Sequence, residues 1–203
     1  MKKTIDVLGL GCTAVDDILY VPEYPRPDGK VQVRLRERHC GGLCATALVA
    51  AARLGARCAY AGTLGHDEGS AFVRQTLVRE NIDLRHATQH PKASPIRSTI
   101  VVDETRRTRN IFFDIAGGWG AHPHRPARSL IRQARVLLVD RYGLPGMIRA
   151  ATIARAEGVA VVGDFETPGS PPFPQLLALV DHLIVSRTFA CRQTGARSAA
   201  KAA

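Results

Sequence analysis

The sequence lacks any apolar run that approaches the roughly 18 residues a membrane-spanning helix needs. It also lacks the long apolar region and small-residue cleavage site of a signal peptide, although its first residues, 1–4, are basic. We therefore expect a cytoplasmic protein that does not bind a membrane.

Cysteine pairs with the spacing of a metal or redox site are missing as well. The five cysteines include no C-x-x-C pair and are odd in number: Cys12, Cys40, Cys44, Cys58 and Cys191. Free thiols in a reducing compartment fit this pattern better than a disulfide framework. His39, Cys40 and Cys44 are close in sequence, but their spacing matches no common zinc site and a fourth ligand is not evident, so we expect no metal site there.

Aromatic residues are scarce, at 5% of the chain, whereas the net charge is +10. A basic protein can bind nucleic acid, but the arginines are scattered rather than gathered in one tract, and there are few rings on which bases could stack. We therefore expect a solvated basic surface and no nucleic-acid partner.

What the sequence does contain is the composition of a globular domain, with 45% hydrophobic and 23% charged residues in 203. The second part of the chain alternates between apolar strands, at 136–140, 159–164 and 182–186, and helices, at 144–157, 174–180 and 188–194. Such alternation predicts an α/β fold with a mainly parallel sheet that is covered by helices on both faces, a three-layer αβα arrangement.

Strands nearer the N-terminus follow another pattern. Residues 31–36 alternate apolar and charged side chains, and 98–102 with 108–113 predict a hairpin. Strands with one solvent-exposed face do not suit a sheet that is buried on both sides. We therefore predict a separate small β flap over about 15–38 and 97–113. A loop is expected over 116–126, and the small polar residues 196–203 predict a frayed tail.

Gly9-x-Gly11-x-x-Ala14 matches the loose pattern of a dinucleotide-binding turn. That turn requires a helix directly after it, whereas 15–21 predicts an extended stretch and begins with two carboxylates. A dinucleotide-binding enzyme therefore remains only as an alternative.

Asp16 and the pair Gly41-Gly42 are the stronger candidates for a binding site. A carboxylate just past the end of the first strand lies where open α/β sheets bind ligands, and it can accept hydrogen bonds from two hydroxyls of a polyol. Paired glycines before a helix allow the backbone to approach a ligand, and Thr46 adds a hydroxyl one turn later. Each feature alone is equally compatible with an ordinary turn.

Together these features resemble the first signature of the PfkB, or ribokinase, family of sugar kinases: Gly11, Asp16, Gly41-Gly42-x-x-x-Thr46, Gly55 and Gly65. The segment RLGARCAYAGTLGHDEGSAFVRQTLVRENIDL is similar to ribokinases and ketohexokinases. SPIRSTIVVDETRRTRNIFFD is similar to the ketohexokinase flap, and HLIVSRTFACRQTG to a later strand and turn. The resemblance covers 5–195.

The resemblance implies one ribokinase-like domain over 1–195, with a β-flap lid over the sugar that is often shared across a homodimer. It implies transfer of the γ-phosphate of ATP to a sugar hydroxyl with the help of Mg²⁺. By position, Asp16, Gly41 and Gly42 would bind the sugar, and Thr46 stands where many relatives carry Asn.

The sequence departs from the family on the nucleotide side. Ser186 and Phe189 occupy positions where ribokinases carry Asn and Glu, and the motif D-T-x-G-A-G-D, whose last Asp is the catalytic base, does not occur. We therefore expect a fold that is incomplete at the C-terminus, a base that lies beyond Ala203, and a chain inactive in phosphoryl transfer. A non-catalytic sugar-binding or dimerisation module is the alternative.

Overall fold

The computed structural model of the chain describes residues 3–115, 117, 120–167 and 171–202. The predicted loop over 116–126 falls partly outside the described residues, as do Ala203 of the predicted tail and the first two residues of the basic N-terminus. Among the described residues, no helix is long and apolar enough to cross a membrane.

The core of the protein is a sheet of five strands, all parallel to their neighbours. In spatial order the strands are β11 (His182–Val185), β10 (Ala160–Phe165), β9 (Ala134–Val139), β1 (Ile5–Leu10) and β4 (Cys58–Tyr60). The sequence prediction of a mainly parallel sheet is confirmed.

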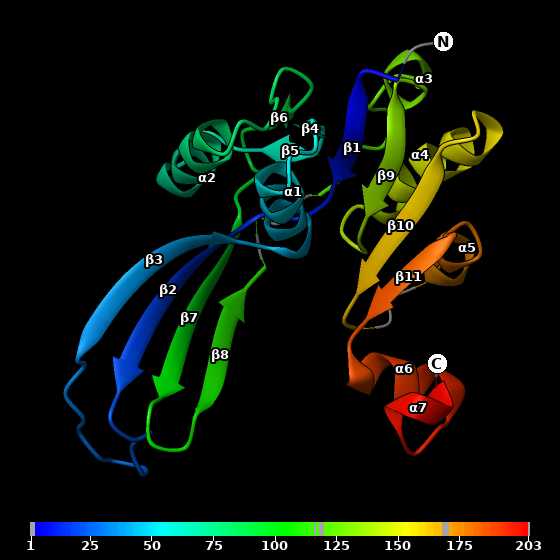
Figure 1. Ribbon diagram of the computed structural model, residues 1–203. Helices are drawn as coiled ribbons and strands as arrows, with labels where there is room; N and C mark the ends of the chain where they lie inside the picture. The colour runs from blue at the N-terminus through cyan, green and yellow to red at the C-terminus, as the bar shows by residue number, and fades with distance from the viewer. Residues whose placement is uncertain (1–2, 116, 118–119, 168–170, 203) are drawn as a thin grey trace.

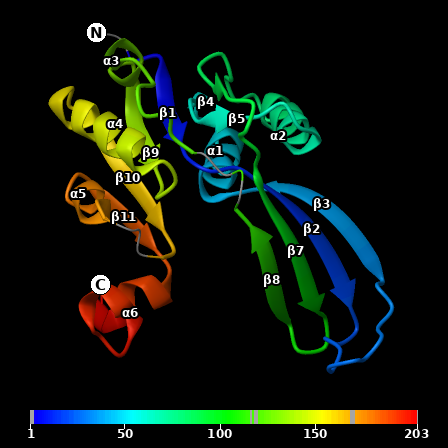
Figure 2. The same cartoon turned by 180° about the vertical axis from the view of Figure 1, so that it is seen from behind.

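Helices cover both faces of this sheet, as Figures 1 and 2 show from opposite sides. On one face lie α1 (Leu43–Arg53) and α2 (Glu68–Arg79), and on the other α3 (Arg128–Ile131), α4 (Leu144–Ala156) and α5 (Phe173–Leu177). Leu48 and Leu77 pack in the first layer, and Met147 and Leu176 in the second. The three-layer arrangement is therefore present, with one apolar core on each side of the sheet.

A second sheet projects from the core and forms the flap (Figure 1). Its strands, in spatial order, are β3 (Leu35–Gly41), β2 (Ala14–Val21), β7 (Ile96–Asp103) and β8 (Thr108–Asp114). Strands β2 and β7 are parallel, and the two outer pairs are antiparallel. Two short strands, β5 (Thr63–Leu64) and β6 (Thr88–Gln89), form a separate parallel pair.

Several boundaries differ from the sequence prediction. The strand expected at 31–36 begins only at Leu35 and continues to Gly41. The partner strand β2 ends at Val21, and the pairing of Tyr20 with Leu35 is the last register position. The amide of Arg34 still donates to the carbonyl of Tyr20 over 2.9 Å, and residues 31–33 lie past the end of that pairing. The helix expected at 174–180 is the shorter α5.

The C-terminal residues include two helices, α6 (Arg187–Thr194) and α7 (Ala199–Ala202), within what is described of that part of the chain. The tail predicted over 196–203 is therefore helical over 199–202, because alanine favours helix and the amides of Lys201 and Ala202 donate to the carbonyl of Ser198.

Candidate functional site

The candidate site begins where the chain leaves the core sheet for the flap, at residues 11–13, which we call the junction. Gly11 follows β1, and β2 begins at Ala14. The hydroxyl of Tyr60 donates to the carbonyl of Gly11 over 2.9 Å, and the amide of Ile96 donates to the carbonyl of Thr13 over 2.9 Å. A strand rather than a helix follows Gly11, which removes the helix N-terminus that a dinucleotide-binding turn requires.

Asp16 and Gly41 lie side by side on paired strands of the flap. A Cβ atom added to Gly41 would lie 1.9 Å from Oδ2 of Asp16, so only glycine leaves room for the carboxylate. Asp16 is the third residue of β2. It follows the first strand of the main sheet, β1, and lies within the flap, because the chain re-enters a strand at Ala14.

The neighbours of Asp16 come from both adjacent strands. His39 of β3 and Ser98 of β7 are its register partners, so all three side chains share one face of the flap. Burial raises the pKa of Asp16, and a hydrogen bond from Ser98 together with the charge of His39 opposes that rise. The carboxylate is half-buried and is thus able to accept hydroxyl hydrogens from a ligand.

Gly42 has a backbone conformation that favours glycine, with φ at 92°. A Cβ atom there would lie 2.7 Å from Cα of Thr13 and 2.8 Å from the carbonyl oxygen of Cys12. The residue is the N-cap of α1 and makes no side-chain cap hydrogen bond. The start of α1 is therefore pressed directly against the junction.

Thr46 lies in the first turn of α1 and is exposed. Its amide donates to the carbonyl of Gly42 over 3.0 Å. Its hydroxyl makes no hydrogen bond to any part of the chain that the structure describes, so a role in binding stays a prediction.

Sequence reasoning missed several residues of this region. Ser98 was part of a predicted strand, but only the register of β2 and β7 places it beside Asp16. Tyr142 packs against a small apolar cluster at the junction that contains Cys12, Ala14 and Ile96. The guanidinium of Arg141 lies 4.7 Å from the centroid of the Tyr142 ring. No sequence motif marks these contacts, because they depend on the loop after β9.

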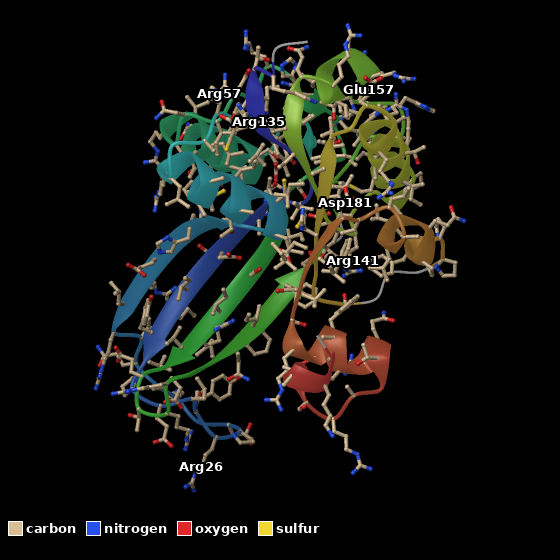
Figure 3. The ribbon with its side chains drawn as sticks, turned by 45° about the vertical axis from the view of Figure 1, so that its right-hand side comes forward. Arg26, Arg57, Arg135, Arg141, Glu157 and Asp181 are labelled. Carbon is tan, nitrogen blue, oxygen red and sulfur yellow. The ribbon has the colours of Figure 1, made fainter. Side chains whose placement is uncertain are left out.

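Carboxylates occupy the carboxyl end of the central strands. Asp140 follows β9 and is buried, and Asp164 is the fifth residue of β10. Burial raises the pKa of Asp140 to about 6. The pKa of Asp164 is also raised, mainly by burial and to a smaller extent by the negative charge of Glu166. Figure 3 places Arg141 on the flap side of the core, whereas Arg57 and Arg135, which pair with Asp6, lie at the opposite end of the sheet.

Ser186 and Phe189, which the resemblance assigns to the nucleotide side, lie at the start of α6. The hydroxyl of Ser186 accepts from the amide of Phe189 over 3.1 Å and thereby caps α6. Phe189 is buried, with its ring centroid 6.3 Å from that of Phe165 and 6.2 Å from that of Phe173. Neither residue presents a free carboxylate or amide to a metal–phosphate group, so this pair does not fit Mg²⁺-ATP.

The chain thus combines a three-layer α/β core with a β flap, and the carboxylate of Asp16 lies against Gly41 near the point where the two meet. The family model described as "pfkB family carbohydrate kinase" matches residues 4–202. The chain belongs to the PfkB family of carbohydrate kinases.

Individual relatives agree with this assignment. The chain is 29% identical to a ribokinase of Haemophilus influenzae over 213 residues, which cover 100% of the chain and 68% of that protein. It is 29% identical over 123 residues to a nucleoside kinase of Methanothermobacter thermautotrophicus, covering 60% of the chain and 38% of that protein.

Solved structures show the same fold. A ribokinase of Arabidopsis thaliana, solved in complex with ribose and ATP, superposes with a TM-score of 0.78 at 18% sequence identity. The match covers 100% of the present chain and 67% of the ribokinase chain. An adenosine kinase of Sinorhizobium meliloti superposes with a TM-score of 0.76 at 18% sequence identity, and the match covers 98% of the present chain and 70% of the adenosine kinase chain. The chain thus spans about two thirds of the length of these relatives.

Proposed function

We propose that this chain binds a sugar through Asp16, Gly41, Gly42 and Thr46, as the acceptor site of a kinase that phosphorylates a sugar hydroxyl with ATP. The observation that supports this most is the fit of the Asp16 carboxylate over Gly41, where no other side chain has room. An ionised carboxylate can accept hydrogen bonds from two neighbouring hydroxyls, which orients a polyol.

ATP and Mg²⁺ enter this proposal through the family alone. The transferred phosphoryl group must be positioned and its charge stabilised, and ATP with Mg²⁺ supplies that group when bound. We assign no phosphate-binding role to Ser186 or Phe189, because the first is used as a helix cap and the second is packed in the core. This pair favours a second candidate function, sugar binding without phosphoryl transfer.

The test of sugar binding is titration calorimetry of the parent chain and Asp16→Asn with D-ribose, D-fructose and D-glucose. We expect saturable binding of at least one sugar and a loss of about tenfold or more in affinity for Asp16→Asn, since a charge-assisted hydrogen bond contributes about 1.5–3 kcal/mol. Asp17→Asn is the matched control. Asp17 is next in sequence but pairs with Arg38 on the other face of the flap, 2.7 Å away.

Equal losses in Asp16→Asn and Asp17→Asn would contradict the proposed site. An ATP-coupled assay on the same samples separates the two functions: turnover supports the kinase, and binding without turnover supports the second candidate.

We further propose a cytoplasmic location and a homodimer formed through the flap. Free thiols among the described residues, Cys12 and Cys44 included, suit a reducing compartment. Ile111 and Phe113 are exposed and lie on the Asp16 face of the flap, where a second copy would cover them.

A further inference from the structure

Asp140 is a buried carboxylate that the sugar-binding proposal does not use. Its side chain is 1% exposed, and each of its oxygens accepts a hydrogen bond from a different segment. The amide of Cys12 donates to Oδ2 over 2.7 Å, and the amide of Tyr142 donates to Oδ1 over 2.8 Å. One carboxylate therefore ties the junction to the loop after β9.

The groups around Asp140 bring no positive charge. The thiols of Cys12 and Cys44, the hydroxyls of Tyr60 and Tyr142, and the carboxyl of Asp164 are the titratable groups that face it. Within the described ranges, no arginine, lysine or histidine forms an ion pair with it. A buried carboxylate without a cation is costly, so the two amide donors and the thiol of Cys12 are what stabilise its charge there.

Both tethered segments lead directly to the candidate site. Cys12 lies four residues before Asp16 on the same chain. Tyr142 packs with Cys12, Ala14, Ile96 and Leu43, and Leu43 follows the Gly41-Gly42 pair. The backbone packs closely against the Asp140 carboxylate, since a Cβ atom on Gly11 would lie 2.3 Å from Oδ2 of Asp140.

We propose that Asp140 is a positioning residue that fixes the flap to the core and thereby holds Asp16 over Gly41 for sugar binding. The part of the inference that concerns sugar rests on the function proposed above. The part that concerns the junction rests on the two hydrogen bonds alone.

The chemistry requires a carboxylate rather than an amide. The two backbone N–H groups donate to different oxygens and the thiol of Cys12 donates as well, so both side-chain oxygens must accept. Asparagine has one carbonyl oxygen, and its NH₂ would face the second N–H donor with no acceptor between them. Protonation of Asp140 weakens the tie in the same way, because the two backbone hydrogen bonds favour the ionised form.

Amide hydrogen exchange tests the junction without any sugar. In Asp140→Asn we expect exchange at Cys12 or Tyr142 to be about tenfold or more faster than in the parent, since a charge-assisted hydrogen bond is lost. Asp181→Asn is the matched control: Asp181 also accepts a backbone amide, that of Val161 over 2.8 Å, but at the amino end of β10. It should leave both amides protected.

Sugar titration of the same variants tests the link to Asp16. Affinity should fall about tenfold in Asp140→Asn and stay at the parent value in Asp181→Asn. Unchanged protection of Cys12 and Tyr142 in Asp140→Asn would overturn the inference. Faster exchange with parent-like sugar affinity would overturn the positioning of Asp16. If the parent binds no sugar, the proposed function fails while the exchange result still decides whether Asp140 ties the junction.

If Asp140→Asn does not fold, the pH dependence of amide exchange in the unmodified protein tests the same inference. Since the pKa of Asp140 is raised to about 6, the carboxyl gains its proton as the pH falls from 7 to 5. Protection of Cys12 and Tyr142, corrected for the intrinsic exchange rate, should then drop more than that of Val161. Equal changes at all three amides would count against the inference.

Discussion

Strands β9 and β8 show how differently the core and the flap are stabilised. Leu137 and Val139 of β9 are buried on one face of the sheet, and Leu138 is buried on the other. Every residue of β8 is exposed, and Phe112 and Phe113 point to opposite faces of the flap with 54% and 62% of their surface accessible. Both strands are rich in apolar residues, so sequence hydrophobicity alone does not decide which strand is packed.

The stability of the flap therefore depends on its attachment to the core and on what covers its exposed faces. The core has two apolar layers of its own, whereas the flap packs only at its base, through the small cluster around Cys12, Ala14 and Ile96 and through Val15 among the described residues. Stability should therefore reside in the core, and ligand or partner effects should be felt mainly in the flap.

The largest expected effect concerns the packed strand. Leu137→Ala should lower the free energy of unfolding by about 2–5 kcal/mol, because a buried leucine leaves a cavity. Ile111→Ala in the exposed β8 should cost less than about 1 kcal/mol. Urea denaturation of both variants measures the contrast, and similar losses would show that the flap is part of the same cooperative core.

A smaller effect is expected at the point where core and flap meet. Gly41→Ala places a methyl group against the Asp16 carboxylate and should weaken sugar binding by about tenfold, the loss of one good hydrogen bond. Gly55→Ala is the control, since it is strained at φ 91° but has no atom within 4 Å of the new Cβ. Calorimetric titration should find parent-like affinity in Gly55→Ala; equal weakening in both would point to a general effect of strain.

The smallest effect on stability is expected on the exposed faces of the flap. Phe113→Ser and Phe112→Ser should each change the free energy of unfolding by less than about 1 kcal/mol. Only Phe113 shares the face that carries Asp16, so only Phe113→Ser should weaken the proposed homodimer. Analytical ultracentrifugation of both variants decides this, and equal effects would place the interface elsewhere.

Local sequence signals predicted much of the fold. The period of the side chains separated the buried strands from the flap. The start of β3 was missed because it depends on the length of its partner strand, which the alternation at 31–36 cannot reveal.

The candidate site was predictable only where glycine and aspartate stood in a recognisable order. Asp16 and Gly41 could be named from the sequence, but their contact depends on the pairing of β2 with β3. Asp140 and Ser98 fell within predicted strands, but nothing in the sequence paired them with Cys12 and Asp16. Each acts through a partner that is distant in the chain, 128 residues away for the Asp140 and Cys12 pair.

Phe189 shows how one buried side chain fixes the position of a helix. Its ring packs beside those of Phe165 and Phe173, so α6 is anchored to the sheet by aromatic packing. A glutamate at this position would place a charge among phenyl rings and release the helix. A carboxylate could therefore be accommodated at position 189 only if the surrounding rings were replaced as well.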